Sequence, residues 1–185
     1  MAHQSIWYTT HMPDQLIDIL CEDVKSFDES VEPSVVGFDY EVNRKVRIST
    51  NSWVPLNHWI HGLVWSYVDN ANKRNFEYDL QGFDHERIQY THYNKGDFYN
   101  WHQDDSSTSD VPYNRKLSVV VQLSDPEDYE GGNLELLGAF DQKYIAPRTK
   151  GTIIIFDSRT RHRVTKIRSG YRRSLVGWGV GPKWK

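Results

Sequence analysis

Apolar residues recur with helical spacing over two segments near the start of the chain. The first lies within 12–27, and Pro13 stands near its beginning, where a missing backbone amide costs little. Its apolar positions are Leu16, Ile17, Leu20, Val24 and Phe27. The second extends from about Pro55 to Asn72, and its apolar face contains Leu56, Trp59, Ile60, Leu63, Val64 and Tyr67. We expect two helices, the second packed across the outside of a sheet.

The pattern changes after the second helix. From Phe76 onward, short runs rich in Val, Ile, Tyr and Thr alternate with turn residues, which predicts an all-β second half. The expected strands are Phe76–Leu80, Arg87–Tyr93, Phe98–His102, Lys116–Leu123, Leu134–Leu137, Gln142–Ile145, Thr152–Phe156, His162–Val164 and Arg172–Gly179. The two helices are joined by an expected loop, Glu29–Phe38, and by an extended hairpin or edge segment, Asp39–Thr50. The spacing of the strands is typical of a sandwich or jelly roll.

Length and composition set the class of protein. The 185 residues suffice for a single domain, 1–185, with helical support over about 12–74 and a β core over about 76–180. A formal charge of -3 gives no basic footprint, so no nucleic-acid partner is expected. Cys21 is the one cysteine, which excludes an internal disulfide and fits a reducing compartment. Because there is neither a signal-peptide pattern nor an apolar run of transmembrane length, we expect a cytoplasmic protein without a membrane partner.

Candidate metal ligands lie at the end of one predicted strand and the start of another. His102 and Asp104 are two residues apart, and alternate strand residues share a face, so both can bind one ion from the same side. His162 follows the apolar run 151–156 and supplies a third ligand. Two imidazoles and one carboxylate on one face leave open positions, as in non-haem Fe(II) oxygenases. The other histidines considered, His58, His61, His85 and His92, are not assigned to the metal.

The last predicted strand carries an arginine and a hydroxyl on one face. Arg172 and Ser174 share that face with Val176 and Trp178, whereas Arg173 lies on the other. Burying a guanidinium inside a barrel is costly unless an anion meets it. A carboxylate is the natural partner because it matches the guanidinium fork.

These motifs resemble the iron- and 2-oxoglutarate-dependent dioxygenases, and within them the prolyl 4-hydroxylase class with its bacterial and viral relatives. Beyond the His-x-Asp and the distal histidine, that family has a strand with Gln, a small residue and Tyr at alternate positions, matched here by Gln89, Thr91 and Tyr93. Gly96 and Tyr99 also fall at family positions. Three further segments match, over 47–53, 116–126 and 130–134, so the resemblance covers roughly 12–180.

The resemblance implies a double-stranded β-helix, that is a jelly roll, with Fe(II) on His102, Asp104 and His162. It implies 2-oxoglutarate and O2 as cosubstrates and ascorbate as reductant. Arg172 would pair with the far carboxylate of 2-oxoglutarate, assisted by Ser174 or Tyr93. The collagen-type enzymes commonly have lysine where this chain has Arg172, which leaves the chemistry intact but weakens the transfer of substrate identity.

The substrate implied by the resemblance is a prolyl residue in a peptide or protein. Tyr99 and Arg161 are the expected substrate contacts, and Asp105–Asn114 is expected to be a mobile loop at the mouth of the site. The alternatives are hydroxylation of a free amino acid or other small molecule, and a cupin-like metal-binding module without activity. A monomer is expected.

Overall fold

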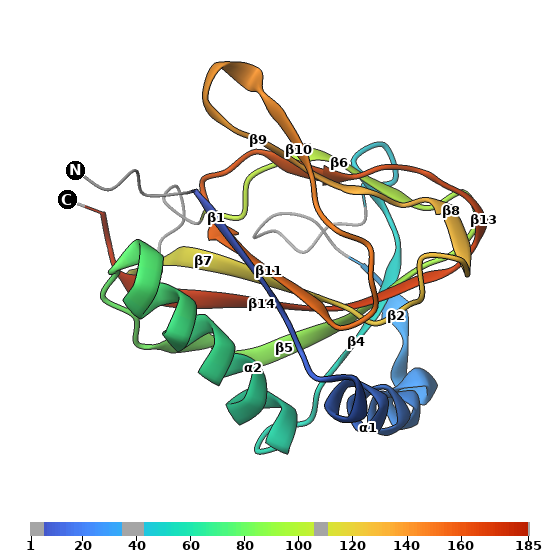
Figure 1. Ribbon diagram of the computed structural model, residues 1–185, viewed down its shortest axis with the longest axis horizontal. Coiled ribbons are helices and arrows are strands. Elements are labelled where there is room, and N and C mark those ends of the chain that lie inside the picture. Colours follow the sequence, from blue (N-terminus) through green and yellow to red (C-terminus); the bar gives the residue numbers. More distant parts are fainter. Residues whose placement is uncertain (1–5, 35–42, 106–110, 185) are drawn as a thin grey trace.

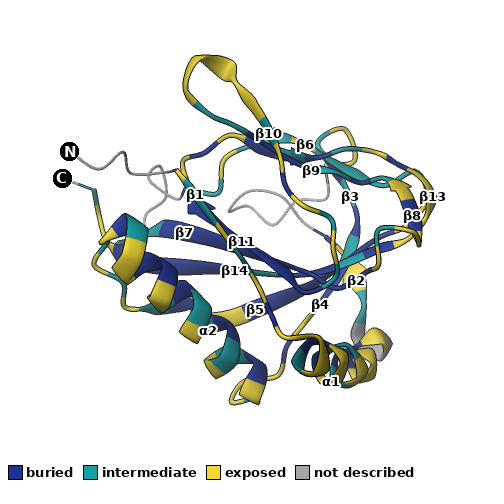
Figure 2. Cartoon of the chain, in the orientation of Figure 1, coloured by how far each residue is buried: buried dark blue, intermediate teal, exposed yellow. Residues whose placement is uncertain are grey.

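Seven antiparallel strands form the larger sheet, in the order β1-β11-β7-β14-β5-β4-β2. The computed structural model describes residues 6–34, 43–105 and 111–184. The strands of this sheet are β1 (Trp7–His11), β2 (Glu32–Pro33), β4 (Thr50–Trp53), β5 (Gly82–Tyr93), β7 (Tyr113–Gln122), β11 (Thr152–Asp157) and β14 (Arg172–Pro182). The central strands β5, β7 and β14 are buried along most of their length, as the dark colour in Figure 2 shows.

A smaller sheet of five strands faces the larger one, in the order β10-β9-β12-β6-β3. These are β3 (Arg47–Ile48), β6 (Phe98–His102), β9 (Leu134–Leu137), β10 (Lys143–Ile145) and β12 (His162–Val164). A two-stranded ribbon, β8 (Tyr129–Gly131) with β13 (Ile167–Gly170), lies at one end (Figure 1). Two facing antiparallel sheets with supporting helices confirm the predicted mainly β jelly roll.

Two helices cover the outer face of the larger sheet (Figure 1). Helix α1 (Asp14–Val24) buries Ile17, Leu20 and Val24, and α2 (Trp59–Ala71) buries a stripe that includes Ile60, Val64 and Val68. His58 caps α2, since its Nδ1 accepts from the amide of Ile60 at 3.4 Å. These apolar stripes meet buried residues of the sheet in one core cluster, so the helices hold the sheet from behind.

A second core cluster fills the space between the two sheets. Its members include Phe156, Leu134 and Val120. Unlike the core under the helices, this space also contains buried polar side chains, among them His162, Arg172 and Ser174. The polar part of the space between the sheets is therefore the candidate site.

The predicted strand Phe76–Leu80 is wrong. A π-helical turn, η2 (Asn72–Phe76), extends α2, and Glu77 has a left-handed backbone with φ 55. The side-chain amide of Asn72 donates to the carbonyl of Tyr78 at 2.8 Å and its oxygen accepts from the amide of Tyr78 at 2.9 Å. One asparagine thus satisfies the backbone groups that a strand partner would otherwise engage.

Other boundaries also differ from the prediction. The first helix ends at Val24 and continues as a 3-10 turn, η1 (Lys25–Ser30), not as an α-helix to Phe27. Strand β1, at the edge of the larger sheet, was not predicted, because its sequence shows no apolar alternation. It is a strand because it pairs with β11. A 3-10 turn, η3 (Ala139–Asp141), precedes β10.

Two expected segments fall partly outside the described residues. Positions 106–110 of the predicted loop Asp105–Asn114 are not described, and its end at Tyr113 already belongs to β7. Within 39–50, residues 39–42 are not described, and the rest leads into β3 and β4. Over the described ranges, no helix has both the length and the apolar character needed to cross a membrane.

Two glycines should respond oppositely to substitution by alanine. Gly131 has φ +76, and a Cβ there would lie 2.1 Å from the carbonyl oxygen of Lys166, whereas a Cβ on Gly62 would meet nothing within 4 Å. Gly131→Ala should lower the free energy of unfolding by about 2 kcal/mol or more through backbone strain. Gly62→Ala, within α2, should raise it by roughly 0.5–1 kcal/mol. Urea denaturation measures both, and equal effects would contradict the described turn.

Candidate metal centre and anion pocket

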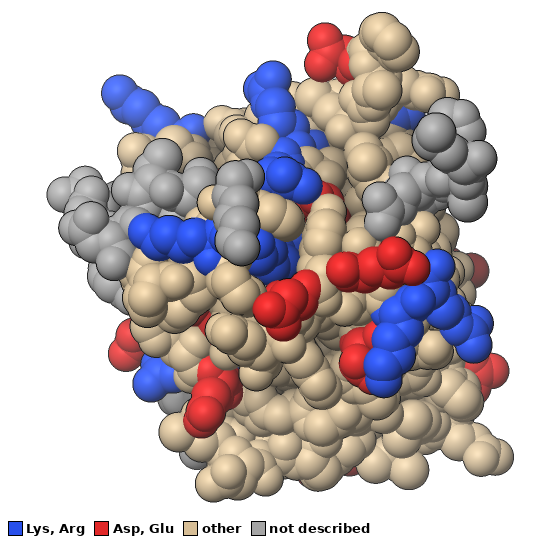
Figure 3. All heavy atoms as spheres, turned by 90° about the vertical axis from the view of Figure 1, so that its left-hand side faces the viewer, with Lys and Arg blue, Asp and Glu red and all other residues tan. Residues whose placement is uncertain are grey.

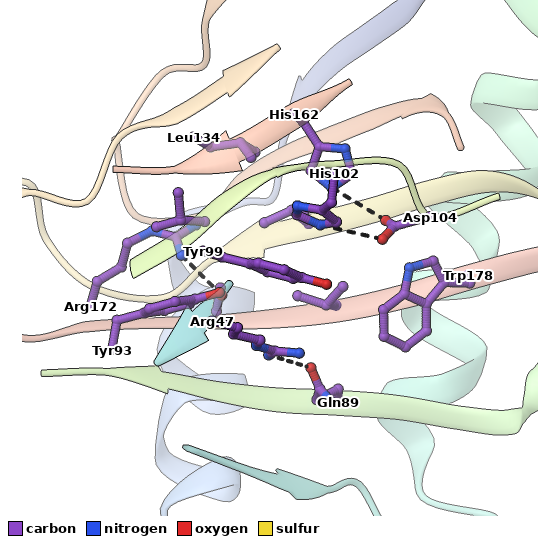
Figure 4. A pocket seen from close by; sticks show the side chains of 14 residues that line it. Arg47, Gln89, Tyr93, Tyr99, His102, Asp104, Leu134, His162, Arg172 and Trp178 are labelled. Carbon is purple, nitrogen blue, oxygen red and sulfur yellow. Dashed lines mark hydrogen bonds and ion pairs between the residues drawn. The ribbon is translucent and has the colours of Figure 1, made fainter. Parts of the chain in front are cut away.

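Pairing of β6 with β12 brings two histidines together. His102 and His162 are register partners across these antiparallel strands, and their ring centroids lie 4.1 Å apart. Asp104 follows β6 and is held by its backbone amide, which donates to the carbonyl of Ser158 at 2.9 Å. One ligand atom from each of the three residues lies within 4.8 Å of the others (Figure 4). The structure therefore brings together the three predicted metal ligands.

Backbone carbonyls orient both imidazoles. Nδ1 of His102 lies 2.7 Å from the carbonyl oxygen of Asn100, and Nδ1 of His162 lies 2.9 Å from that of Thr160. A carbonyl can only accept, so each Nδ1 carries the hydrogen and each Nε2 presents a lone pair. The two Nε2 atoms face the Asp104 carboxylate at 3.5 and 3.4 Å. This donor set fits a divalent transition metal, and the Nδ1 contacts are the outer-shell bonds usual for metal-bound histidine.

A pair of buried serines holds the carboxylate. Ser118 donates to Oδ2 of Asp104 at 2.8 Å, and its Oγ lies 3.0 Å from that of Ser158. Both serines are fully buried. Burial raises the pKa of Asp104, but the nearby imidazoles of His162 and His102 outweigh it and hold that pKa well below its usual range. The group is thus an anionic ligand in a fixed orientation.

Aromatic rings fix the planes of the two imidazoles. Tyr99 stacks on His102 with centroids 3.5 Å apart and 13° between planes. Phe156 contacts His162 edge-on at 4.7 Å. Burial, with a smaller contribution from Asp104, raises the pKa of Tyr99, so its hydroxyl remains a hydrogen-bond donor at neutral pH. The predicted substrate contact Tyr99 therefore lies directly beside the metal ligands.

Arg172 lies at the other end of the same cavity and is 1% exposed. One terminal nitrogen donates to Oε1 of Gln122 at 2.9 Å, the other is 3.4 Å from Oγ of Ser174, and Nε has no partner. The ring of Tyr93 lies 5.5 Å from the guanidinium carbon. Burial lowers the pKa of Arg172, but arginine stays charged in proteins. A buried cation whose partners here are neutral is a site for an anion.

A second buried arginine lines the cavity on its other side. Arg47 is 6% exposed and donates to Oγ of Ser49 at 2.7 Å and to Oε1 of Gln89 at 3.0 Å. Its guanidinium carbon lies 4.8 Å from the centroid of the Tyr99 ring. Figure 4 shows the order along the cavity: Arg172 and Tyr93 at one side, the metal ligands in the middle and Trp178 at the far side. The cavity encloses about 430 Å³, its open mouth included.

The remaining predictions fall outside this cavity. Arg161 is exposed and lines a separate shallow hollow with Gln103 and Thr160, so its contact with substrate stays a prediction. His92 is on the opposite side of its strand, with Nε2 3.3 Å from a carboxylate oxygen of Asp28. The described residues that could together bind a metal do not include His58, His61, His85 or His92.

Among the lining or supporting residues that were not predicted as site residues are Arg47, Ser118 and Gln122. The sequence does carry a signal for two of them. Ser118 and Gln122 lie on one face of β7 within its mostly apolar part, 117–122, and a polar side chain in such a place needs a buried partner. Which partner each would find depends on the facing strands.

The face that Figure 1 has on its left carries acidic and basic side chains side by side (Figure 3). It is not a surface of one charge sign, so on this face there is no uniformly basic footprint of the kind that binds nucleic acid.

Sequence comparison places the site within a known family model. Residues 88–179 match the model described as the 2OG-Fe(II) oxygenase superfamily. A PKHD-type hydroxylase of Parvibaculum lavamentivorans is 35% identical over 92 residues, 50% of this chain and 41% of the relative. Another, from Synechococcus elongatus, is 37% identical over 92 residues, 48% of this chain and 40% of the relative. This chain thus spans about two-fifths of the length of these curated relatives.

Solved structures share the fold. A Pseudomonas putida prolyl-4-hydroxylase matches with a TM-score of 0.75 at 20% identity, over 97% of this chain and 94% of that chain. A prolyl hydroxylase of Trichoplax adhaerens, in complex with a hypoxia inducible factor oxygen degradation domain peptide fragment, matches with a TM-score of 0.77 at 17% identity, over 94% and 83%. The resemblance drawn from the motifs is confirmed by the family match, and the jelly roll by these folds.

Loss of the Ser118 hydroxyl should weaken metal binding. Ser118→Ala frees the Asp104 carboxylate to rotate, and removal of such an outer-shell partner typically costs about 10- to 100-fold in metal affinity. Anaerobic titration should therefore give an Fe(II) Kd roughly tenfold higher or more. Ser66→Ala is the matched control, because the Ser66 hydroxyl donates only to a helix carbonyl, that of Leu63. An unchanged Kd in Ser118→Ala would contradict the assigned role of the hydrogen bond.

Proposed function

We propose that this chain, which belongs to the 2OG-Fe(II) oxygenase superfamily, is an Fe(II)- and 2-oxoglutarate-dependent hydroxylase acting on a prolyl residue of a peptide or protein. One observation carries the proposal: three metal-ligand side chains and a buried arginine without a carboxylate partner line a single cavity. The family match over 88–179 includes all four residues. The activity, the cosubstrate contacts and the substrate are proposals.

In this proposal His102, Asp104 and His162 hold Fe(II), and Arg172 binds the far carboxylate of 2-oxoglutarate. When bound, the metal would let O2 oxidise both the keto acid and the substrate: one oxygen atom would enter succinate as CO2 leaves, and the other would pass to the substrate. The protein contributes position. Gln122 and Ser174 orient the guanidinium of Arg172, and the Tyr93 ring lies beside it. The carboxylate of the cosubstrate would therefore meet a guanidinium that is already in position.

The ligand set also bears on the alternative of a non-catalytic metal-binding module. A closed structural zinc site uses four protein ligands, whereas the described cluster offers three and faces an open cavity. A structural metal would also not require a buried arginine in the same cavity. Both features favour an enzyme.

The substrate side of the cavity favours a polypeptide. Arg47, the Tyr99 hydroxyl and the indole of Trp178 are donors that line the same cavity as the metal ligands, and the partners of Arg47 are neutral. Donors of this kind match the carbonyl oxygens of a peptide backbone. The solved Trichoplax adhaerens complex, which holds a peptide fragment, has the same fold, and the names of the curated relatives describe hydroxylases.

Oxygen transfer tests the proposal. The protein is incubated in air with Fe(II), 2-oxoglutarate and ascorbate, against proline-containing peptides in one set and free amino acids, including proline, in another. A mass gain of one oxygen atom on a peptide, with an equivalent of succinate, is the expected result. Asp104→Ala, which lacks the carboxylate ligand, is the control and should form neither product.

Two outcomes would contradict the proposal at different levels. Oxidation of a free amino acid with the peptides untouched would refute the peptidyl substrate and leave the iron and 2-oxoglutarate roles standing. Absence of succinate in every arm, together with metal binding by the wild-type protein, would favour the non-catalytic module.

A further inference from the structure

Strand β5 bulges out opposite Trp178. Its pairing with β14 steps from Gly177↔Ile88 to Gly179↔Phe83, so that residues 84–87 have no register partners. Within this bulge His85 and Glu86 adopt left-handed backbones, with φ of 50 and 55. Residues other than glycine rarely adopt this conformation, and it persists only where the surroundings impose it. Such strain is found preferentially at functional sites.

The surroundings do hold the bulge in place. Buried Asp84 accepts hydrogen bonds from Nε of Arg115 at 2.7 Å and from the hydroxyl of Tyr113 at 2.7 Å. The guanidinium carbon of Arg115 in turn lies 4.2 Å from the centroid of the Trp178 ring. The bulge is thereby tied to β7 and to a residue that lines the cavity of the metal ligands.

Two surface hollows continue from that cavity along the bulge and helix α2. The first shares Trp178 with the cavity and is also lined by Trp53, Leu56 and Glu86. Two arginines line it as well: Arg115 pairs with Asp84, and the guanidinium carbon of Arg87 lies 5.6 Å from the centroid of the Trp53 ring. The second shares Leu56 and Glu86 with the first and extends to Gly62, Trp65 and Phe83. We call the surface made by these two hollows, Trp53, Leu56, Gly62, Trp65, Phe83 and Glu86, the α2–bulge groove. The shared residues place the first hollow beside the metal cavity and the second beside the first, against α2.

The groove has an apolar floor and an acidic position. Trp65 and Phe83 meet edge-on, with centroids 5.0 Å apart, and Leu56 and Trp53 are 56% and 40% exposed. Gly62 leaves the space above this floor open, since a Cβ there would meet nothing within 4 Å. Glu86 lines both hollows and forms no ion pair with the described residues, whereas its neighbour Asp84 is neutralised by Arg115.

We propose that the α2–bulge groove binds the part of a polypeptide substrate that flanks the hydroxylated residue. An apolar side chain of the substrate packs on Leu56, Trp65 and Phe83, and a lysine or arginine pairs with Glu86. This inference rests on the proposed hydroxylase function. An extended chain is the occupant that fits, because it alone can fill the cavity and both hollows at once, at about 3.3 Å per residue. A small substrate would leave the exposed apolar surface of Leu56 and Trp53 uncovered.

A peptide library with one fixed central proline tests the groove. Peptides of about 15 residues, randomised on both sides, are long enough to extend well past the cavity at roughly 3.3 Å per residue. They are incubated with the Fe(II)- and 2-oxoglutarate-loaded protein, and the hydroxylated members are sequenced by mass spectrometry. The wild-type protein should enrich a basic and an apolar residue at fixed offsets on one side of the proline.

Two variants assign each preference to its residue. Gly62→Trp adds an indole to the apolar hollow at a position where a Cβ meets nothing within 4 Å, and it should lower kcat/KM by about tenfold for peptides with the preferred apolar residue, the scale of one anchor side chain. Glu86→Lys should change the preference at its offset from lysine and arginine to aspartate and glutamate. Asn70→Trp, which adds the same indole to an exposed position of α2 outside the groove, is the matched control and should retain the wild-type preferences.

The outcomes separate this inference from the function on which it rests. If the library were hydroxylated without a flanking preference, or if the preferences survived in both variants, the α2–bulge groove would not be the binding site for the flanking residues. The proposed peptidyl hydroxylase function would be unaffected. A wild-type protein that binds Fe(II) and 2-oxoglutarate but hydroxylates no library member would overturn both.

Discussion

A guanidinium buried without a carboxylate is the constraint on which the site depends. Two partly exposed arginines of this fold pair with acids, Arg115 with Asp84 and Arg163 with Glu135, whereas buried Arg47, like Arg172, meets neutral groups. Arg172 is more deeply buried, at 1% exposure, and is met by the neutral groups of Gln122 and Ser174. Since an uncompensated charge in a protein interior is expensive, the core between the sheets is stable with Arg172 in place only if an anion completes it or water reaches it.

The facing and pairing of the strands place Arg172 and the metal ligands in one cavity. Alternation along β14 points Arg172 and Ser174 into the cavity, whereas the side chain of Arg173 reaches Asn94 on the other side. The pairing of β6 with β12 sets the two histidines opposite each other in the facing sheet. The metal ligands and the anion pocket thus belong to different sheets, which pack on each other through the second core cluster, while helices α1 and α2 support the larger sheet from behind.

The sequence predicted the parts of this site that depend on local periodicity. His102 and Arg172 lie at strand positions whose facing follows from alternation, Asp104 comes two residues after the end of β6, and the chain supplies a distal histidine at the start of a further strand. Contacts between strands distant in the chain could not be predicted. Ser118 on β7 meets Asp104 across the space between the sheets, whereas Gln122 meets Arg172 because β7 is the neighbour of β14 in the larger sheet. The bulge in β5 likewise depends on Arg115 and Tyr113, and the edge strand β1 on its partner β11.

The role of Arg172 as the partner of the far carboxylate of 2-oxoglutarate is tested by the affinity of the Fe(II)-loaded protein for 2-oxoglutarate. This affinity is measured anaerobically from the visible charge-transfer absorbance of the chelate. We expect the wild-type protein to bind one equivalent of 2-oxoglutarate. Arg172→Gln should lose a charge-assisted pair worth about 2 kcal/mol or more, a rise in Kd of roughly thirtyfold. Arg173→Gln, on the other face of the strand, should bind as the wild type does. If the Kd of Arg172→Gln stayed within about threefold of the wild-type value, the expected loss would be absent and Arg172 would not bind the carboxylate. A wild-type protein that stays colourless would contradict the chelate itself.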